Sequence, residues 1–329
     1  MKNLLGQTEE IVQKAKKLGA DEVVAKTTFG KYRQVRFSNN QVDITVAWND
    51  YVTDVVLAWK KRVVATQIHN FHDTDASLKK LLKLAKVTKE NPTFAGFAKG
   101  KFRYAKSKAD RKLADLEKPS DYVLEALGAA EKEAGANIKC GGILFTKYED
   151  VYLASSEGPV GVDSRSAVEL SIRAFTEREA SGHGVECSSA LKNFRPASAG
   201  AIAGRIAKLA RNPKAGEEGV YDVIFGPLIL GSLLGYVWGS MASAYNVLVQ
   251  QSVFVGKLGK KVAPEIVTFR DNPAAYSVAN RVYDDEGVPT RENVVIDHGT
   301  LKTYLHNTST AKIFKTKTTG NAGDRKSDE

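Results

Sequence analysis

The chain has 329 residues, of which 43% are hydrophobic and 26% charged, and this composition excludes an intrinsically disordered protein. Its length exceeds the usual size of a single hydrophobic core, which predicts two domains. The net charge of +10 is concentrated in residues 79–118, where 13 Lys and Arg stand against 4 Asp and Glu. The two cysteines, Cys140 and Cys187, are too few for a disulfide framework and form no C-x-x-C pair.

The N-terminal third predicts helices on either side of an antiparallel meander. The expected helices are residues 4–18 before Gly19, 75–87, and 121–134 before Gly135. The expected strands are residues 33–37, 42–48, 53–59 and 63–68, separated by the turns SNN, WND and KKR. No apolar segment with a cleavage site follows Met1, so we expect a cytoplasmic protein.

Residues 92–118 are basic and have little apolar periodicity, which predicts a long surface excursion. Aromatic residues are interleaved with the cations, namely Phe94, Phe97, Phe102 and Tyr104. Proteins that bind single-stranded nucleic acid combine stacking rings with cations in this way. A nucleic-acid patch would centre on Lys99, Lys101, Arg103 and Lys106, although solvated lysine-rich faces are commoner.

The second half predicts another β block, a domain boundary and a hairpin. Residues 138–175 form the β block, and a helix near residues 199–210 follows. Turn formers in residues 212–219 place the boundary between domains 1–215 and 216–329. Residues 221–225 predict a strand, and His298-Gly299 predicts a tight hairpin turn.

Residues 223–256 contain no Asp, Glu, Lys, Arg or His. Within them Leu230, Leu233, Leu234, Val237 and Met241 form one helical stripe, which predicts a buried core helix. Gly231, Gly235 and Gly239 recur every four residues and predict a groove for close packing, because glycine costs about 1 kcal/mol against alanine in a helix. A transmembrane helix is the alternative, disfavoured by the Ser, Tyr, Asn and Gln of the second half.

Candidate metal ligands are sparse. His69 and His72 are separated by two residues, a spacing compatible with metal binding on a turn, but no acidic or thiol partner lies close in sequence. His183 and Cys187 supply only two ligands in a glycine-rich stretch. Residues 283–289, YDDEGVP, could hold a cation, but a solvated acidic turn is the favoured interpretation. Walker, Rossmann, G-x-S-x-G and H-E-x-x-H motifs are absent from the sequence.

Several stretches, in the same order and spacing, resemble the TldD/PmbA family, also called the modulator-of-gyrase family. They are SSEGPVGVDSRSAVELSIRAF at 155–175, GKLGKKVAPEIVTFRDNP at 256–273, YDDEGVPTRENVVIDHGTLKTYLHNTSTAKI at 283–313 and TTGNA at 318–322. The resemblance implies an α+β fold of two domains: an N-terminal helix and antiparallel-sheet domain, and a C-terminal curved antiparallel-sheet domain around one buried helix. It also implies that the C-terminal domain is incomplete at Glu329, because the family extends further.

The catalytic TldD branch of this family carries H-E-x-x-x-H directly after a Leu-Leu pair. Here Leu233-Leu234 is followed by Gly235 and Ser240 at the histidine positions and by Tyr236 at the glutamate position. Zinc sites need imidazole, thiolate or carboxylate ligands, which these residues do not provide. The sequence is therefore most similar to the PmbA/TldE branch, which lacks the motif.

The resemblance implies a non-catalytic subunit of a zinc metallopeptidase complex that acts on unfolded or peptide substrates. We expect no catalytic residue, metal or cofactor in this chain, and zinc in an H-E-x-x-x-H partner subunit. The chain would offer a sheet edge and groove to an extended peptide, and could form a homodimer when alone. A nucleic-acid or gyrase-associated protein using residues 79–118 is the alternative, and no membrane partner is expected.

Overall fold

The fold is α+β, with a large antiparallel sheet in the first two thirds of the chain and a small one in the last third. A computed structural model describes residues 3–273 and 277–323, without the side chains of residues 236 and 237. The large sheet has the strand order β3-β2-β1-β4-β5-β6, and the small sheet has the order β7-β8-β9. These two antiparallel sheets confirm the predicted fold class.

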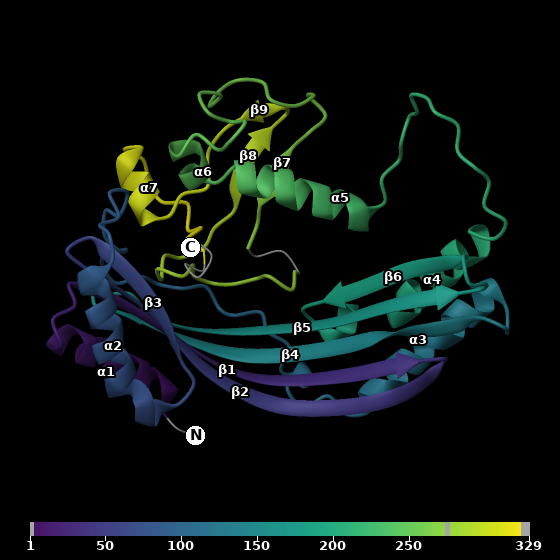
Figure 1. Ribbon diagram of the computed structural model, residues 1–329, viewed down its shortest axis with the longest axis horizontal. Coiled ribbons are helices and arrows are strands. Elements are labelled where there is room, and N and C mark those ends of the chain that lie inside the picture. Colours follow the sequence, from purple (N-terminus) through teal and green to yellow (C-terminus); the bar gives the residue numbers. More distant parts are fainter. Residues whose placement is uncertain (1–2, 274–276, 324–329) are drawn as a thin grey trace.

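The large sheet is built from long strands that pair over most of their length (Figure 1). They are β1 (Glu22–Ser38), β2 (Gln41–Trp59), β3 (Arg62–Ile68), β4 (Lys139–Ser155), β5 (Val160–Phe175) and β6 (Ser181–Ser188). The two strands expected at 42–48 and 53–59 are one strand, so the predicted WND turn was wrong. Asn49 and Asp50 are held extended because β1 continues opposite them, with Lys31 and Gly30 as partners.

Two pairs of helices cover different parts of this sheet. α1 (Leu4–Lys17) and α2 (Thr74–Val87) pack at the β3 end, and α3 (Pro119–Ala134) and α4 (Pro196–Leu209) pack toward the β6 end. Gly200 and Gly204 let α4 approach the backbone of α3, since a Cβ at Gly200 would lie 1.9 Å from the Ala126 carbonyl oxygen. The helix positions expected from periodicity are confirmed.

The last third carries short elements around its own core. They are α5 (Pro227–Leu234), α6 (Ala244–Leu248), β7 (Phe269–Asp271), β8 (Asn293–Asp297), β9 (Thr300–Leu301) and α7 (Thr308–Ile313). The hairpin between β8 and β9 turns at His298 and Gly299, both with positive φ, as predicted. The boundary expected at 215/216 falls in an irregular connection between α4 and α5, and it stays a prediction.

Residues 92–110, which we call the strap, run between the large sheet and the C-terminal part. Phe94 and Phe97 join Val24 and Leu153 of the sheet and Tyr283 of the C-terminal part in one buried cluster. The Tyr104 hydroxyl donates a hydrogen bond to the Gly287 carbonyl at 2.8 Å. The first residues of the strap therefore belong to the core, whereas its later cationic side chains lie on the surface, as its composition predicted.

Candidate functional site

The candidate site is the segment 227–240, because it carries the positions of the degenerate metal motif. It begins as α5 and continues through a π-helical turn from Gly235 to Gly239. Trp238 packs edge-on against Phe269 of β7, with ring centroids 5.5 Å apart, and so fixes the far end of the segment on the C-terminal core. π-Helical turns are rare and occur frequently at functional sites.

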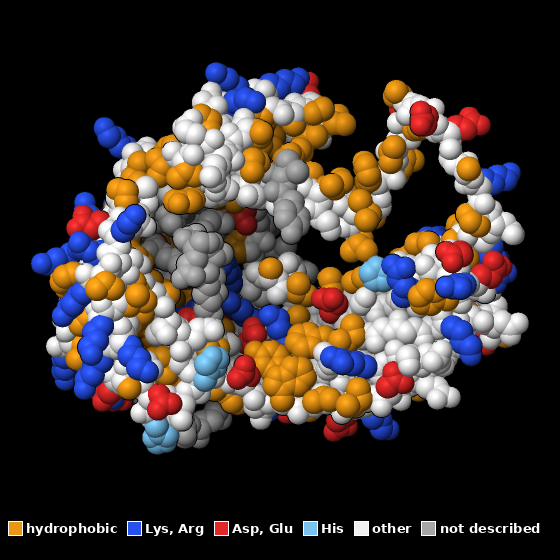
Figure 2. Space-filling model, in the orientation of Figure 1, with side chains coloured by type: hydrophobic (Ala, Val, Ile, Leu, Met, Phe, Trp, Pro, Cys, Tyr) orange, Lys and Arg blue, Asp and Glu red, His pale blue; other side chains and the backbone are white. Residues whose placement is uncertain are grey.

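α5 is exposed, which contradicts the prediction of a buried core helix. Four of its five large apolar side chains are between 40% and 54% exposed, namely Leu228, Ile229, Leu230 and Leu233. In Figure 2 the arm formed by α5 and the connection before it stands clear of the sheet, with open space beneath it. An apolar stripe shows that water should be excluded from a helix, but it does not identify the surface that excludes it.

A neighbouring prediction is also corrected. The strand expected at residues 221–225 is irregular and exposed. The glycine groove of Gly231, Gly235 and Gly239 stays a prediction, because a Cβ added at any of the three would meet no described atom within 4 Å. The groove therefore lies open along the helix.

The motif positions themselves offer no metal ligands. The Ser240 carbonyl and hydroxyl oxygens accept hydrogen bonds from the Asn246 amide at 2.8 and 3.1 Å, which ties the end of the turn to α6. Gly235 continues the helical backbone, and the side chain of Tyr236 lies outside the described residues. In the described part of the chain, no group of three or more His, Cys, Asp and Glu is placed to hold a metal ion.

The acidic loop at 283–289 is buried, whereas a solvated turn was expected. Asp284 and Glu286 are 0% and 1% exposed. The Asp284 carboxylate accepts three backbone N–H groups, from Glu286 at 3.0 Å, Val288 at 2.9 Å and Ala322 at 2.9 Å. Turn composition predicted the loop, but it could not show that the Asp284 carboxylate accepts a hydrogen bond from Ala322, which is distant in sequence.

Burial dominates the electrostatics of this loop. Desolvation raises the pKa of Asp284 to about 6, and the neighbouring Glu286 acts in the same direction. The adjacent Asp285 pairs with Lys26 of β1 at 2.8 Å, which links the C-terminal part to the large sheet. Asp285 thus joins the two parts of the protein, whereas Asp284 accepts its three backbone hydrogen bonds within the C-terminal part.

The histidines lie apart from one another. His69 and His72 are exposed at the end of β3, and His183 lies on β6 with its Nε2 atom 2.9 Å from the Ser171 hydroxyl. Cys187 is four residues further along the same strand and is exposed. Sequence reasoning missed His306, which is buried among Tyr304 and Phe314 and whose pKa is lowered by that burial.

The proposed nucleic-acid patch is divided between core and surface. Phe94 and Phe97 are buried and are not available for base stacking. Lys99 forms an ion pair with Glu157 at 3.0 Å. The side chains of Lys101, Arg103 and Lys106 are exposed on the strap.

Comparisons with known proteins agree with this fold. Residues 110–212 match the PmbA/TldA metallopeptidase central domain, and residues 218–328 match the PmbA/TldA metallopeptidase C-terminal domain. A TldD homologue described as a metalloprotease, from Buchnera aphidicola subsp. Acyrthosiphon pisum, is 28% identical over 65% of this chain and 46% of that protein. A metalloprotease from Methanocaldococcus jannaschii is 38% identical over 32% of this chain and 23% of that protein. These matches thus span less than half the length of either relative.

Solved structures extend the likeness to nearly the whole chain. TldE from Thermococcus kodakarensis superposes with a TM-score of 0.82 at 20% identity, covering 98% of this chain and 74% of that one. A putative modulator of a DNA gyrase from Thermotoga maritima gives 0.81 at 21% identity, covering 98% and 75%. At these identities the superpositions show the shared fold.

The fold and the sequence matches define a chain with the central and C-terminal domains found in PmbA/TldA proteins, built on a large antiparallel sheet and a smaller C-terminal one. More narrowly, the chain belongs to the PmbA/TldD family. Among the described helices, none is long and apolar enough to cross a membrane.

Proposed function

We propose that this chain is the non-catalytic subunit of a cytoplasmic zinc metallopeptidase complex that acts on unfolded or peptide substrates. Two observations together carry the proposal. The apolar helix α5 is exposed, and Gly235 and Ser240 occupy the histidine positions of the family motif. A glycine has no side chain to offer, and a serine is not among the usual zinc ligands. The zinc would belong to a partner subunit that has kept H-E-x-x-x-H.

The exposed face of α5 supports the existence of such a partner. Large exposed apolar surfaces mark sites of protein interaction, because leaving them in water is costly. Burying a leucine side chain contributes about 1.5–3 kcal/mol, so α5 alone could supply the centre of an interface. Its three glycines would let a partner helix or an extended peptide approach the backbone closely.

The large sheet supports a role with extended peptides. β3 pairs only with residues 53–59 of β2, so residues 41–52 have no partner strand on that side among the described residues. Ile44, Val46 and Trp48 are exposed along this edge. An extended peptide can add to such an edge through main-chain hydrogen bonds, while apolar side chains choose among sequences.

The proposal is tested by co-purification with a family member that carries H-E-x-x-x-H. Leu230 and Leu233 share a face of α5 and are exposed, so the pair Leu230→Asp and Leu233→Asp should fold normally. We expect this pair to weaken association about 100-fold, because it places two charges at the centre of an apolar contact. Analytical ultracentrifugation of the mixed subunits would measure the change.

Leu84→Asp with Leu124→Asp is the matched control, since both leucines are exposed on other helices, α2 and α3. This control pair should associate like the unmodified chain. Failure of the unmodified chain to associate with any H-E-x-x-x-H family member would overturn the proposal. Equal loss in the control pair would show that α5 is not the docking surface.

No observation favours the nucleic-acid alternative over this proposal. Two of its four expected stacking rings are in the core, and Lys99 is engaged with Glu157.

A further inference from the structure

Three aromatic rings from neighbouring strands form a cluster on the face of the large sheet opposite α1–α4, which we call the open face. Tyr32 of β1 and Trp48 of β2 have ring centroids 5.4 Å apart, and Phe145 of β4 lies 6.1 Å from each of them. Tyr32 shares its face of β1 with Lys26, because side chains alternate along a strand, and Lys26 pairs with Asp285. The aromatic cluster is therefore on the side of the sheet that is turned toward the C-terminal part.

Gly30 leaves room for the Tyr32 ring. A Cβ at this glycine would overlap the ring and its hydroxyl, so the ring extends along β1 over Gly30. The Tyr32 hydroxyl donates a hydrogen bond to the Glu149 carboxylate of β4 at 2.9 Å, and Lys147 forms an ion pair with the same carboxylate at 3.2 Å. These contacts hold the aromatic cluster in place, so a ligand meets it already ordered.

The cluster continues into an exposed apolar row on β2. Ile44, Val46 and Trp48 are 50%, 39% and 39% exposed, and they stand at every second residue on the open face. In Figure 2, hydrophobic side chains gather over β1 and β2, below the open space under the arm. Among the described residues, no strand lies on the outer side of residues 41–52, because β3 pairs only with residues 53–59. Main-chain groups and apolar side chains are thus available along the same stretch.

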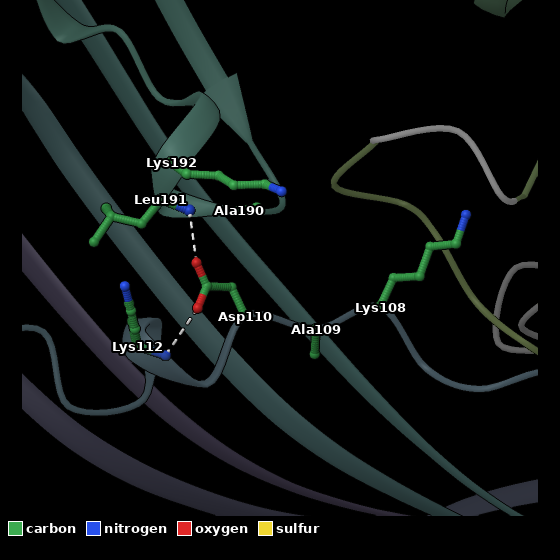
Figure 3. Close-up of a pocket in the computed structure, with 7 residues that line it drawn as sticks. All are labelled: Lys108, Ala109, Asp110, Lys112, Ala190, Leu191 and Lys192. Atoms are coloured by element: carbon green, nitrogen blue, oxygen red, sulfur yellow. Dashed lines mark hydrogen bonds between the residues drawn. The ribbon is translucent and has the colours of Figure 1, made fainter.

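A comparable stretch on the other side of the sheet is covered by the strap. β6 pairs only with the second half of β5, and beside residues 160–167 the Ser107 hydroxyl accepts the Ser164 N–H at 3.0 Å. The Asp110 carboxylate then accepts the Leu191 N–H at 2.9 Å, which fixes the end of the strap to the turn after β6 (Figure 3). The described part of the chain supplies no such cover for the free stretch of β2.

The charge of the β2 edge indicates what fits it. Residues 41–52 contain Asp43 and Asp50 and no Lys, Arg or His. Asp43 accepts a hydrogen bond from the Ser38 hydroxyl and Asp50 from the Tyr51 N–H, and neither forms an ion pair within the described residues. A second copy of this chain would bring the same two acids to the edge, and like charges on paired strands repel. A strand with basic residues at its ends would be attracted instead.

We propose that this edge and the aromatic cluster bind an extended, unfolded polypeptide segment in which apolar or aromatic residues alternate with polar ones and are flanked by Lys or Arg. The segment would add beside residues 41–52 through main-chain hydrogen bonds. Every second side chain would then lie beside Ile44, Val46 or Trp48, at the distance where aromatic and β-branched side chains of neighbouring strands contact each other.

That such segments are substrates rests on the proposed function, whereas their binding can be measured on the isolated chain. The chain can bind the segment and fail to associate with an H-E-x-x-x-H subunit, or the reverse. Failure of this inference and failure of the proposed function are therefore separate outcomes.

The test is fluorescence anisotropy with a short labelled peptide that alternates Phe or Val with Thr and is flanked by lysines. A peptide of the same composition and charge, shuffled so that apolar and polar residues no longer alternate, should bind at least about tenfold more weakly. The alternating peptide flanked by glutamates should bind about threefold more weakly, because its ends meet Asp43 and Asp50.

Two variants test the two parts of the surface, and circular dichroism checks that each folds. Trp48→Ser should raise the Kd for the alternating peptide about tenfold, because the cluster and the row share this ring. Ile44→Ser leaves the rings in place and should raise the Kd about threefold. Trp48→Phe keeps a ring and should bind nearly as tightly as the unmodified chain.

Phe175→Ser is the matched control, because Phe175 is an aromatic residue at the far end of β5 with the same exposure as Trp48, 38% against 39%. This control should leave the Kd unchanged, and equal weakening by it would overturn the proposal. Equal binding of the shuffled or the glutamate-flanked peptide would also overturn it, as would no binding of the alternating peptide. Self-association of the chain that Trp48→Ser abolishes would assign the edge to a second copy and contradict the proposal.

Discussion

Asp284 shows how burial changes the chemistry of a single residue. Its carboxylate is fully buried and accepts three backbone hydrogen bonds, yet desolvation still raises its pKa from 3.8 to about 6. The hydrogen bonds favour the charged form, but they offset only part of the cost of removing the charge from water. The residue therefore titrates in a range where exposed aspartates are already ionised.

This shift predicts a pH dependence of stability. Because the folded pKa lies above the unfolded one, the contribution of Asp284 is fully present below pH 3.8 and is lost as the pH rises through 6. The loss is on the order of 3 kcal/mol. Asp284→Asn cannot titrate, so the difference in unfolding free energy between the variant and the unmodified chain should shift in favour of the variant between pH 4 and 7.

Urea unfolding at a series of pH values would measure that difference. The variant itself should be less stable at low pH, because its amide nitrogen cannot accept the Ala322 N–H. A difference that stays constant across this pH range would contradict the account. Asp285→Asn is a useful comparison, since Asp285 is paired with Lys26 and lies outside the three-bond arrangement.

Single residues also show where sequence reasoning stopped. Charge and turn composition located the loop at 283–289, but burial of Asp284 depends on residues 318–322, which are distant in sequence. His306 gave no spacing signal because its partners are a neighbouring threonine and aromatic rings. Gly235 and Ser240 were recognised as positions of a degenerate metal motif only because the family resemblance supplied the H-E-x-x-x-H motif for comparison.

At the scale of elements, periodicity predicted the helices well and the strand limits less well. α1, α2, α3 and α4 follow their apolar stripes closely. β2 crosses a turn-forming sequence because pairing with β1 outweighs the local preference of Asn49 and Asp50. The burial of α5 was mispredicted for a different reason, since an apolar stripe predicts burial without identifying a surface to pack against, and four of its large apolar side chains are exposed.

Glycines in α4 and α5 have opposite surroundings, and this predicts opposite effects of alanine. Gly200→Ala would place a Cβ 1.9 Å from the Ala126 carbonyl oxygen, so α3 and α4 must separate, at a cost of about 3 kcal/mol. The Cβ of Gly231→Ala would contact no described atom, and alanine favours the helical backbone more than glycine does. This change should therefore stabilise the isolated chain by about 0.5–1 kcal/mol. Chemical denaturation of both variants would check the signs.

The same Gly231→Ala change should weaken association with a partner, because its methyl group fills the open groove. A variant that is more stable and yet associates less tightly would show that the open groove serves association and is not needed for folding of the isolated chain. Gly231→Ala that destabilises the isolated chain would show that the groove is closely packed within this chain after all.

At the scale of the whole molecule, the strap and the acidic loop connect the large sheet to the C-terminal part. Phe94, Phe97 and Tyr283 share one cluster, and Lys26 pairs with Asp285 across the same junction. α5 stands clear of the sheet in Figure 1, and the π-helical turn that follows it is anchored on the C-terminal core through Trp238. Among the described residues, the molecule thus presents an apolar helix and an unpaired strand edge as separate surfaces.

The central claim is that another polypeptide performs the hydrolysis. Its most direct test is to measure tightly bound zinc and hydrolysis of an unfolded protein for this chain alone, for an H-E-x-x-x-H family member alone, and for the two mixed. We predict no stoichiometric zinc and no cleavage with this chain alone, and cleavage in the mixture that depends on the histidines of the partner. One zinc held by each purified copy of this chain, together with peptide-bond cleavage in the absence of a partner, would contradict the account.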